Sequence, residues 1–129
     1  MIGYITIGAR DTAQGIAFYD AVLGTIGYKR FAEFGTFTGY GIDGKSDGQS
    51  VWVCKPFDGN EARAGNGIMV AFGAADRGQV NAFYDAAMKH GGSDEGPPGL
   101  RDSYGPNWYA AYLRDPTGNK LAVVYNKPA

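Results

Sequence analysis

The five residues AFYDA occur twice in this chain, at positions 17–21 and again at positions 82–86, which is an offset of 65 residues. At this offset residues 4–24 align with residues 69–89, and nine of the 21 pairs are identical. Unrelated segments of this length share about one or two identities. Because the offset is close to half of the 129-residue length, the repeat indicates an internal duplication. We expect the two copies to pack about a pseudo-twofold axis with a cleft between them.

Three signals predict the same order of elements in both copies: the alternation of apolar and polar residues, the positions of glycines, and the helix-capping residues. The first copy, residues 1–55, is predicted to contain strands at 2–9, 28–34, 36–42 and 49–55, and a helix that begins at Asp11 or Thr12. Residues 56–66 are predicted to be a linker. The second copy, residues 67–129, is predicted to contain a helix at 76–90 and strands at 67–73, 107–114 and 119–126. Together they form a single domain over residues 1–129.

Residues 93–105 have only weak strand character, because glycine, proline and aspartate dominate them. We expect this segment to be a mobile loop. By contrast, the paired aromatic residues of the two predicted helices, Phe18 with Tyr19 and Phe83 with Tyr84, are expected to pack in the core.

Composition excludes several classes of function. The formal net charge is −1 and the Lys and Arg residues are scattered, so we expect neither a nucleic-acid nor a membrane partner. Cys54 is the only cysteine, which rules out an internal disulfide and predicts a buried, apolar role for this side chain. No basic segment followed by an apolar run opens the sequence, and no stretch has the ~18 apolar residues of a membrane span. We therefore expect a cytoplasmic protein.

Residues 114–124 read RDPTGNKLAVV, and the D-P-x-G-N turn before the last predicted strand is specific. With the paired βαβββ modules, it makes the chain resemble the vicinal oxygen chelate superfamily of glyoxalase I, bleomycin-resistance proteins and extradiol dioxygenases. The resemblance covers essentially the whole chain. It implies an α+β fold in which two βαβββ modules form a U-shaped, partly open mixed-sheet barrel around a cleft. It also implies a homodimer.

Metal-dependent members of this superfamily take His or Glu ligands from the first and last strand of each module. The resemblance places these positions on Tyr4, on Met69, on Ala122, and on Trp52 or a neighbour. None of these side chains is a usual ligand for a divalent metal. The one histidine, His90, is expected to cap the end of a helix instead. We therefore expect no metal and no other cofactor.

An arginine stands close to several aromatic residues after the predicted loop, in a segment that edges the cleft in this superfamily. Arg101 could hold a carboxylate or phosphate while a planar group stacks on Trp108. Alternatively, Trp108 and Tyr109 pack on opposite faces of a strand and Arg101 is solvated. Alternation places Trp108, Ala110 and Tyr112 on one face without showing which face it is. The predicted cleft residues are Tyr4, Trp52, Met69, Arg101, Tyr104, Trp108, Tyr109 and Ala122.

The leading hypothesis is a metal-independent protein of the glyoxalase/bleomycin-resistance type that binds a planar or aromatic organic molecule in the cleft between the modules. The alternative is a lyase, isomerase or dioxygenase of the same superfamily, similar to lactoylglutathione lyase, that acts through a non-standard metal site or without a metal, with Tyr4 or Arg101 polarising a substrate oxygen. Glyoxalase-type proton transfer needs a base, and Ala122 stands where the superfamily has glutamate. A third hypothesis is a partner-binding module with a vestigial cleft. Asp115 is expected to be a turn residue and not a catalytic acid.

Overall fold

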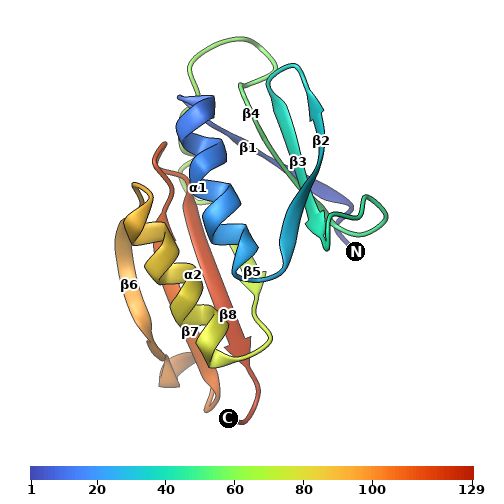
Figure 1. Ribbon diagram of the computed structural model, residues 1–129. Helices are drawn as coiled ribbons and strands as arrows, with labels where there is room; N and C mark the ends of the chain where they lie inside the picture. The colour runs from blue at the N-terminus through green and yellow to red at the C-terminus, as the bar shows by residue number, and fades with distance from the viewer.

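The computed structural model describes residues 1–129 and contains two βαβββ modules, as predicted (Figure 1). The first module consists of β1 (Tyr4–Gly8), α1 (Thr12–Gly24), β2 (Tyr28–Phe34), β3 (Phe37–Ile42) and β4 (Ser50–Cys54). The second consists of β5 (Val70–Gly73), α2 (Arg77–Lys89), β6 (Ser93–Leu100), the short 3-10 helix η1 (Asp102–Tyr104), β7 (Trp108–Arg114) and β8 (Lys120–Asn126). Residues 55–69 connect the modules and contain no helix or strand.

The two sheets have equivalent topology. Their strand orders are β1-β4-β3-β2 and β5-β8-β7-β6. β1 runs parallel to β4, and β5 runs parallel to β8, while all other neighbouring strands are antiparallel. Each sheet remains open, with no strand pair closing it into a barrel. The α+β class and the partly open arrangement are confirmed.

The two helices begin in the same way because the duplication includes their caps. The side chain of Asp11 accepts a hydrogen bond from Gln14 N at 3.1 Å, and that of Asp76 accepts one from Gln79 N at 2.7 Å. This is the N-cap interaction, so Asp11 and not Thr12 caps the first helix. His90 lies at the C-cap of α2 with Nδ1 2.8 Å from Ala86 O, which confirms its predicted capping role.

The prediction of a loop at residues 93–105 was wrong for its first eight residues, which form β6. This strand pairs with β7 at the edge of its sheet, with register shifts on both sides of Gly96. A proline has no backbone N–H to donate, and an edge strand tolerates that loss because one of its sides faces solvent. Pro97 and Pro98 therefore fit this strand, although their presence hides it from sequence analysis.

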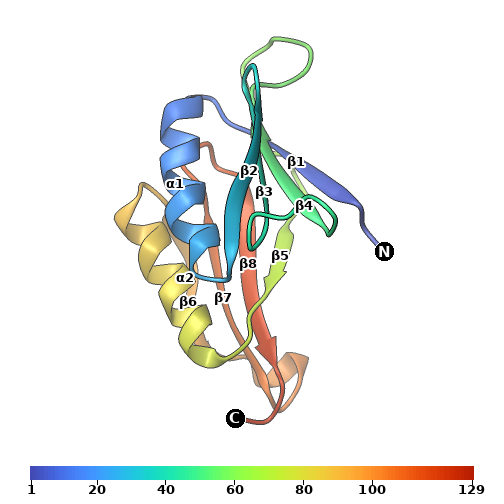
Figure 2. The ribbon, with the colours of Figure 1, turned by 45° about the vertical axis from the view of Figure 1, so that its right-hand side comes forward.

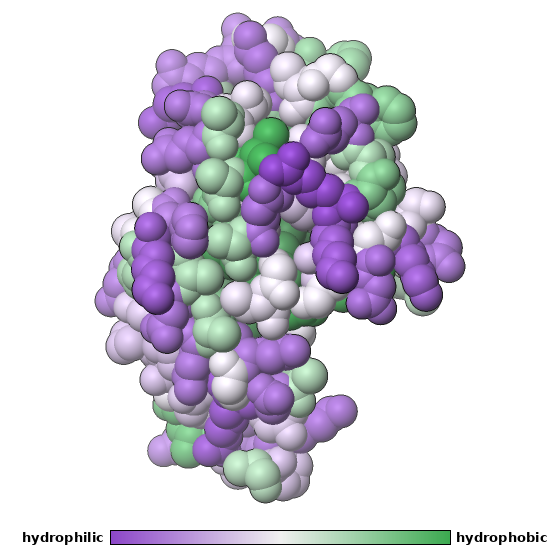
Figure 3. All heavy atoms as spheres, viewed as in Figure 1, coloured by the Kyte–Doolittle hydropathy of each residue, from purple (hydrophilic) through white to green (hydrophobic).

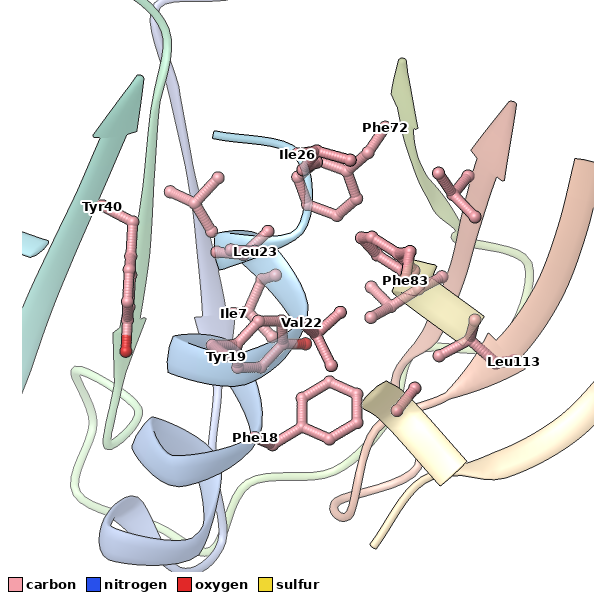
Figure 4. Packing of buried hydrophobic residues seen from close by; sticks show 14 of the residues in the cluster. Ile7, Phe18, Tyr19, Val22, Leu23, Ile26, Tyr40, Phe72, Phe83 and Leu113 are labelled. Atoms are coloured by element: carbon pink, nitrogen blue, oxygen red, sulfur yellow. The ribbon is translucent and has the colours of Figure 1, made fainter. Parts of the chain in front are cut away.

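Both helices lie on the same side of the two sheets, and the opposite face of each sheet carries no helix (Figure 2). One hydrophobic core joins the modules on the helix side, where Phe18, Tyr19 and Val22 of α1 face Phe83 of α2 and Leu113 of β7 (Figure 4). The core prediction is confirmed for Phe18, Tyr19 and Phe83. Tyr84 is only partly buried, and its hydroxyl donates to Asp94 Oδ1 at 3.0 Å.

Cys54 is buried and its thiol lies 3.9 Å from Ile7 O. Burial raises the pKa of this thiol, which favours its neutral form. The predicted buried role is therefore confirmed.

The buried carboxylate of Asp115 joins the two modules. Its Oδ1 accepts hydrogen bonds from the backbone N–H groups of Thr117, Gly118 and Asn119 at 2.9, 3.0 and 3.0 Å. Its Oδ2 accepts from Asn119 Nδ2 at 2.9 Å and from the Tyr19 hydroxyl at 2.6 Å. Burial and the neighbouring carboxylate raise the pKa of Tyr19 well above its usual value, so the phenol stays protonated and donates.

Two further bonds connect this turn to the first module. Asn119 Nδ2 donates to Gly8 O at 2.9 Å, and Thr117 Oγ1 accepts from Arg10 N at 3.0 Å. The D-P-x-G-N turn is therefore the polar link between modules, and Asp115 is a turn residue as predicted.

On the side seen in Figure 3, hydrophilic residues cover most of the left edge and also lie across the middle, and hydrophobic residues show between them near the centre and at the upper right edge. Neither helix combines the length and the apolar composition that crossing a membrane requires.

We predict that Tyr19→Phe lowers the free energy of unfolding by about 1.5–3 kcal/mol, because a buried carboxylate loses one of its donors. Urea denaturation followed by circular dichroism measures this change. Tyr125→Phe is the matched control, since the Tyr125 hydroxyl bonds Pro128 O in an exposed position and its loss should change stability by less than about 0.5 kcal/mol. Equal stability of Tyr19→Phe and the wild type would show that the link contributes nothing.

Candidate functional site

The helix-free face of the first sheet holds a cavity of about 500 Å³, named here the Trp52 cavity. Alternation along β1 and β4 sends Ile5, Ile7, Val51 and Val53 toward the helices, and leaves Tyr4 and Trp52 on the free face. The lining residues are Tyr4, Thr6, Phe31, Phe34, Phe37, Ser46, Ser50 and Trp52.

Trp52 is the centre of this cavity. Phe34 stacks on it with ring centroids 6.0 Å apart and an interplanar angle of 21°, and Phe31 meets it edge-on at 5.4 Å. The indole Nε1 donates to Ser50 Oγ at 3.1 Å. Gly39 of β3 leaves the space for the indole ring, because a Cβ at this position would lie 2.8 Å from its atoms. The cavity therefore presents a preformed aromatic surface without a charged group.

The helix-free face of the second sheet holds a separate cavity of about 680 Å³, named here the Arg101 cavity. Trp108 and Tyr112 alternate along β7 onto this face, and Trp108 Nε1 donates to the Tyr112 hydroxyl at 3.1 Å. Tyr104 meets Trp108 edge-on at 6.0 Å. The lining residues are Met69, Glu95, Arg101, Ser103, Tyr104, Trp108, Tyr112 and Lys120.

The guanidinium of Arg101 is held by backbone carbonyls. Nη1 donates to Gly99 O at 2.9 Å and Nη2 donates to Pro97 O at 2.7 Å, and the group lies 5.4 Å from the centroid of the Tyr112 ring. Glycine is needed at position 96, where φ is +151° and a Cβ would lie 3.1 Å from Arg101 Nη2. Arg101 therefore lies on the wall of the cavity, partly exposed to solvent, with its guanidinium oriented by these two bonds.

The structure distributes the predicted cleft residues over these two cavities. Tyr4 and Trp52 line the first, while Met69, Arg101, Tyr104 and Trp108 line the second. Ala122 of β8 lies opposite Tyr112 in the strand ladder and on the same side of the sheet.

Tyr109 does not belong with the other predicted cleft residues. It faces α2, where its hydroxyl donates to Asn81 Oδ1 at 2.7 Å and its ring lies 5.0 Å from the Arg77 guanidinium. Trp108 and Tyr109 thus lie on opposite faces of β7, which is the arrangement that the sequence analysis gave as the alternative to ligand binding.

Sequence analysis did not identify several lining residues. Tyr112 shares the alternation of Trp108 and could have been found from it. Phe31 and Phe34 lie in β2 and contact Trp52. The register of β2 against β3 shifts at Phe31, and no local sequence pattern predicts that irregularity. Lys120 begins β8 directly after the D-P-x-G-N turn and gave no signal of its own.

The strand registers make Trp52 and Ala122 equivalent positions. Thr6 pairs with Trp52 in the first sheet, and its counterpart at the 65-residue offset, Ala71, pairs with Ala122 in the second. The resemblance gives Tyr4, Trp52, Met69 and Ala122 as the positions of the metal ligands, and their side chains are a phenol, an indole, a thioether and a methyl group. This set does not fit a divalent metal ion, which prefers imidazole, carboxylate or thiolate ligands. No group of three or more His, Cys, Asp or Glu side chains is arranged to hold a metal ion elsewhere.

We predict that Gly39→Ala displaces the Trp52 ring and lowers the free energy of unfolding by about 1–3 kcal/mol, because the added methyl overlaps the indole. In a Trp108→Phe background Trp52 is the only tryptophan, so its fluorescence and near-ultraviolet circular dichroism report the displacement. Gly24→Ala is the control, since a Cβ there meets no atom within 4 Å. Unchanged Trp52 spectra in Gly39→Ala would contradict this description of the cavity.

Comparison with solved structures gives strong similarity over the whole chain. A glyoxalase/bleomycin resistance protein from Albidiferax ferrireducens T118 is 34% identical, with 99% of each chain covered and a TM-score of 0.86. A glyoxalase/bleomycin resistance protein/dioxygenase family enzyme from Burkholderia phytofirmans PsJN is 19% identical, with 97% of this chain and 98% of that chain covered and a TM-score of 0.73.

A V278E mutant of glyoxalase I from Zea mays shares the fold at 21% identity and a TM-score of 0.75, with 95% of this chain but 45% of that chain covered. No protein-family model and no curated protein matches the chain.

Proposed function

The chain belongs to the glyoxalase/bleomycin resistance protein family of the vicinal oxygen chelate superfamily, and we propose that it is a metal-independent member that binds a planar or aromatic organic molecule. The observation that carries this proposal is the aromatic lining of the helix-free faces, which includes Tyr4 and Trp52 at two of the four positions that the resemblance gives for metal ligands. Trp52 with Phe34 and Trp108 with Tyr104 offer two surfaces on which a planar molecule can stack. Such stacking contributes about 0.5–1.5 kcal/mol per aromatic pair beyond the burial of area.

The enzymatic alternative has less support from the residues of the site. Proton transfer next to a carbonyl needs a base within hydrogen-bond reach of the substrate. Glu95 is the acidic residue of the Arg101 cavity, and its carboxylate is paired with Arg114 at 2.7 Å. The position of the superfamily's glutamate is Ala122, which has no group that accepts a proton.

Homodimerisation also belongs to this proposal, because both helix-free faces expose large apolar side chains. Tyr4 and Phe34 of the first module are 66% and 67% exposed, and Met69 and Tyr104 of the second are 42% and 65% exposed. We propose that the first module of one copy faces the second module of another copy. The Trp52 and Arg101 cavities would then combine into the one cleft expected between modules.

Metal independence predicts that Zn²⁺, Ni²⁺ or Mn²⁺ leaves the thermal midpoint unchanged, because the four equivalent side chains offer no suitable ligand set. Differential scanning fluorimetry of the EDTA-treated protein measures this. A saturable rise in the midpoint that EDTA reverses would contradict the proposal. So would turnover of a hemithioacetal that EDTA abolishes.

Ligand binding predicts that the uncharged planar probe 2-naphthamide binds saturably in isothermal titration calorimetry. Trp52→Ala and Trp108→Ala should each weaken it about fivefold to tenfold, because each removes a stacking surface. Tyr109→Phe, altered on the opposite face of β7, is the control and should bind as the wild type does. Absence of binding, or binding that neither tryptophan variant weakens, would overturn the proposed site.

Dimerisation predicts that the protein sediments as a dimer at micromolar concentrations and that Phe34→Glu shifts it toward the monomer, because a charge would be buried in the interface. Analytical ultracentrifugation measures both. Lys89→Glu, altered in the last turn of α2, is the control and should leave the dimer intact. A monomeric wild-type protein would contradict this part of the proposal.

A further inference from the structure

The Arg101 cavity contains two cations that no acidic side chain neutralises. Lys120 and Arg101 both line it, and neither forms an ion pair with a carboxylate. The acid of the cavity, Glu95, is bound by Arg114, whose Nη1 also donates to Gly118 O at 2.8 Å. The charge of Glu95 is therefore already compensated, and the cavity keeps a positive excess.

Arg101 has hydrogen-bonding capacity left for a ligand. A guanidinium has five N–H groups, and the carbonyls of Pro97 and Gly99 accept from two of them. These two bonds fix the group in place, so that a bound anion would order it at little further cost in entropy. A fixed guanidinium with free N–H groups suits the two oxygens of a carboxylate or phosphate.

A neutral donor adds to this arrangement. The Tyr112 oxygen accepts a hydrogen bond from Trp108 Nε1, and its own proton has no acceptor within the protein. Tyr112 can therefore donate to a ligand from beside the guanidinium, which lies 5.4 Å from its ring. Arg101, Lys120 and Tyr112 thus offer free donors to a ligand, while the carboxylate of Glu95 is engaged through Oε1 by Arg114. This excess of donors and of positive charge favours an anion.

We infer that the ligand of this cavity is an anionic aromatic molecule, whose carboxylate or phosphate binds Arg101 and Lys120 while its planar part lies against Trp108 and Tyr104. This inference rests on the proposed function and narrows it to one class of ligand. The common requirement is an oxyanion attached to a planar apolar group. A carboxylate and a phosphate both satisfy it.

Three probes of similar shape test the inference by isothermal titration calorimetry: 2-naphthoate, 2-naphthyl phosphate and the uncharged 2-naphthamide. At least one anion should bind about tenfold or more tightly than the amide, and the ratio of the two anions tells which oxyanion the cavity favours. Arg101→Met and Lys120→Met should each reduce the affinity for that anion about tenfold and leave the affinity for the amide within about twofold.

Matched variants keep the outcome decisive. Lys89→Met removes a positive charge at the end of α2 and should retain the full preference for the anion. Lys120→Met remains informative if Arg101→Met unfolds, because no hydrogen bond of the fold depends on the Lys120 ammonium. Equal binding of the amide and both anions would overturn the inference and preserve the proposed function. A preference that survives both substitutions would also overturn it, whereas failure of all three probes to bind would defeat the proposed function itself.

Discussion

The arrangement of the two modules depends on the carboxylate of Asp115. This buried group has five hydrogen-bond donors, four from its own turn and one from Tyr19 in the other module. A buried carboxylate without such donors would cost several kcal/mol, so the turn and α1 can occupy only positions that supply them. The hydrophobic core then fills the space between the two helices and the two sheets.

This constraint leaves the opposite faces of both sheets for function. On the helix side, Tyr19 forms the hydrogen bond to the second module, while its counterpart in the repeat, Tyr84, makes only a local bond to Asp94. The strand residues that alternate away from the core, Trp52 in β4 and Trp108 in β7, line cavities instead. Stability and proposed ligand binding therefore rest on opposite sides of the same strands.

The features that depend on local chemistry could be predicted from the sequence alone. The repeat located both modules, the Asp and Gly residues located the helix ends and the final turn, and the 65-residue offset paired Tyr4 with Met69. Features that depend on packing between distant segments were missed. Pro97 and Pro98 concealed β6, whose edge position makes prolines acceptable, and only the packing of α2 shows that Tyr109 faces the core. The irregular register of β2 similarly brings Phe31 to Trp52 without any local signal.

The central claim is that this family member binds a planar anion in the Arg101 cavity, on the helix-free face of its second sheet, without a metal. Two-dimensional ¹H–¹⁵N spectra of the protein in EDTA test it most directly, since the indole N–H groups of Trp52 and Trp108 give separate signals. The account predicts that 2-naphthoate shifts the Trp108 signal saturably while the backbone signals of α1 and α2 stay in place. Shifts confined to the helices, with both indole signals unmoved, would contradict it.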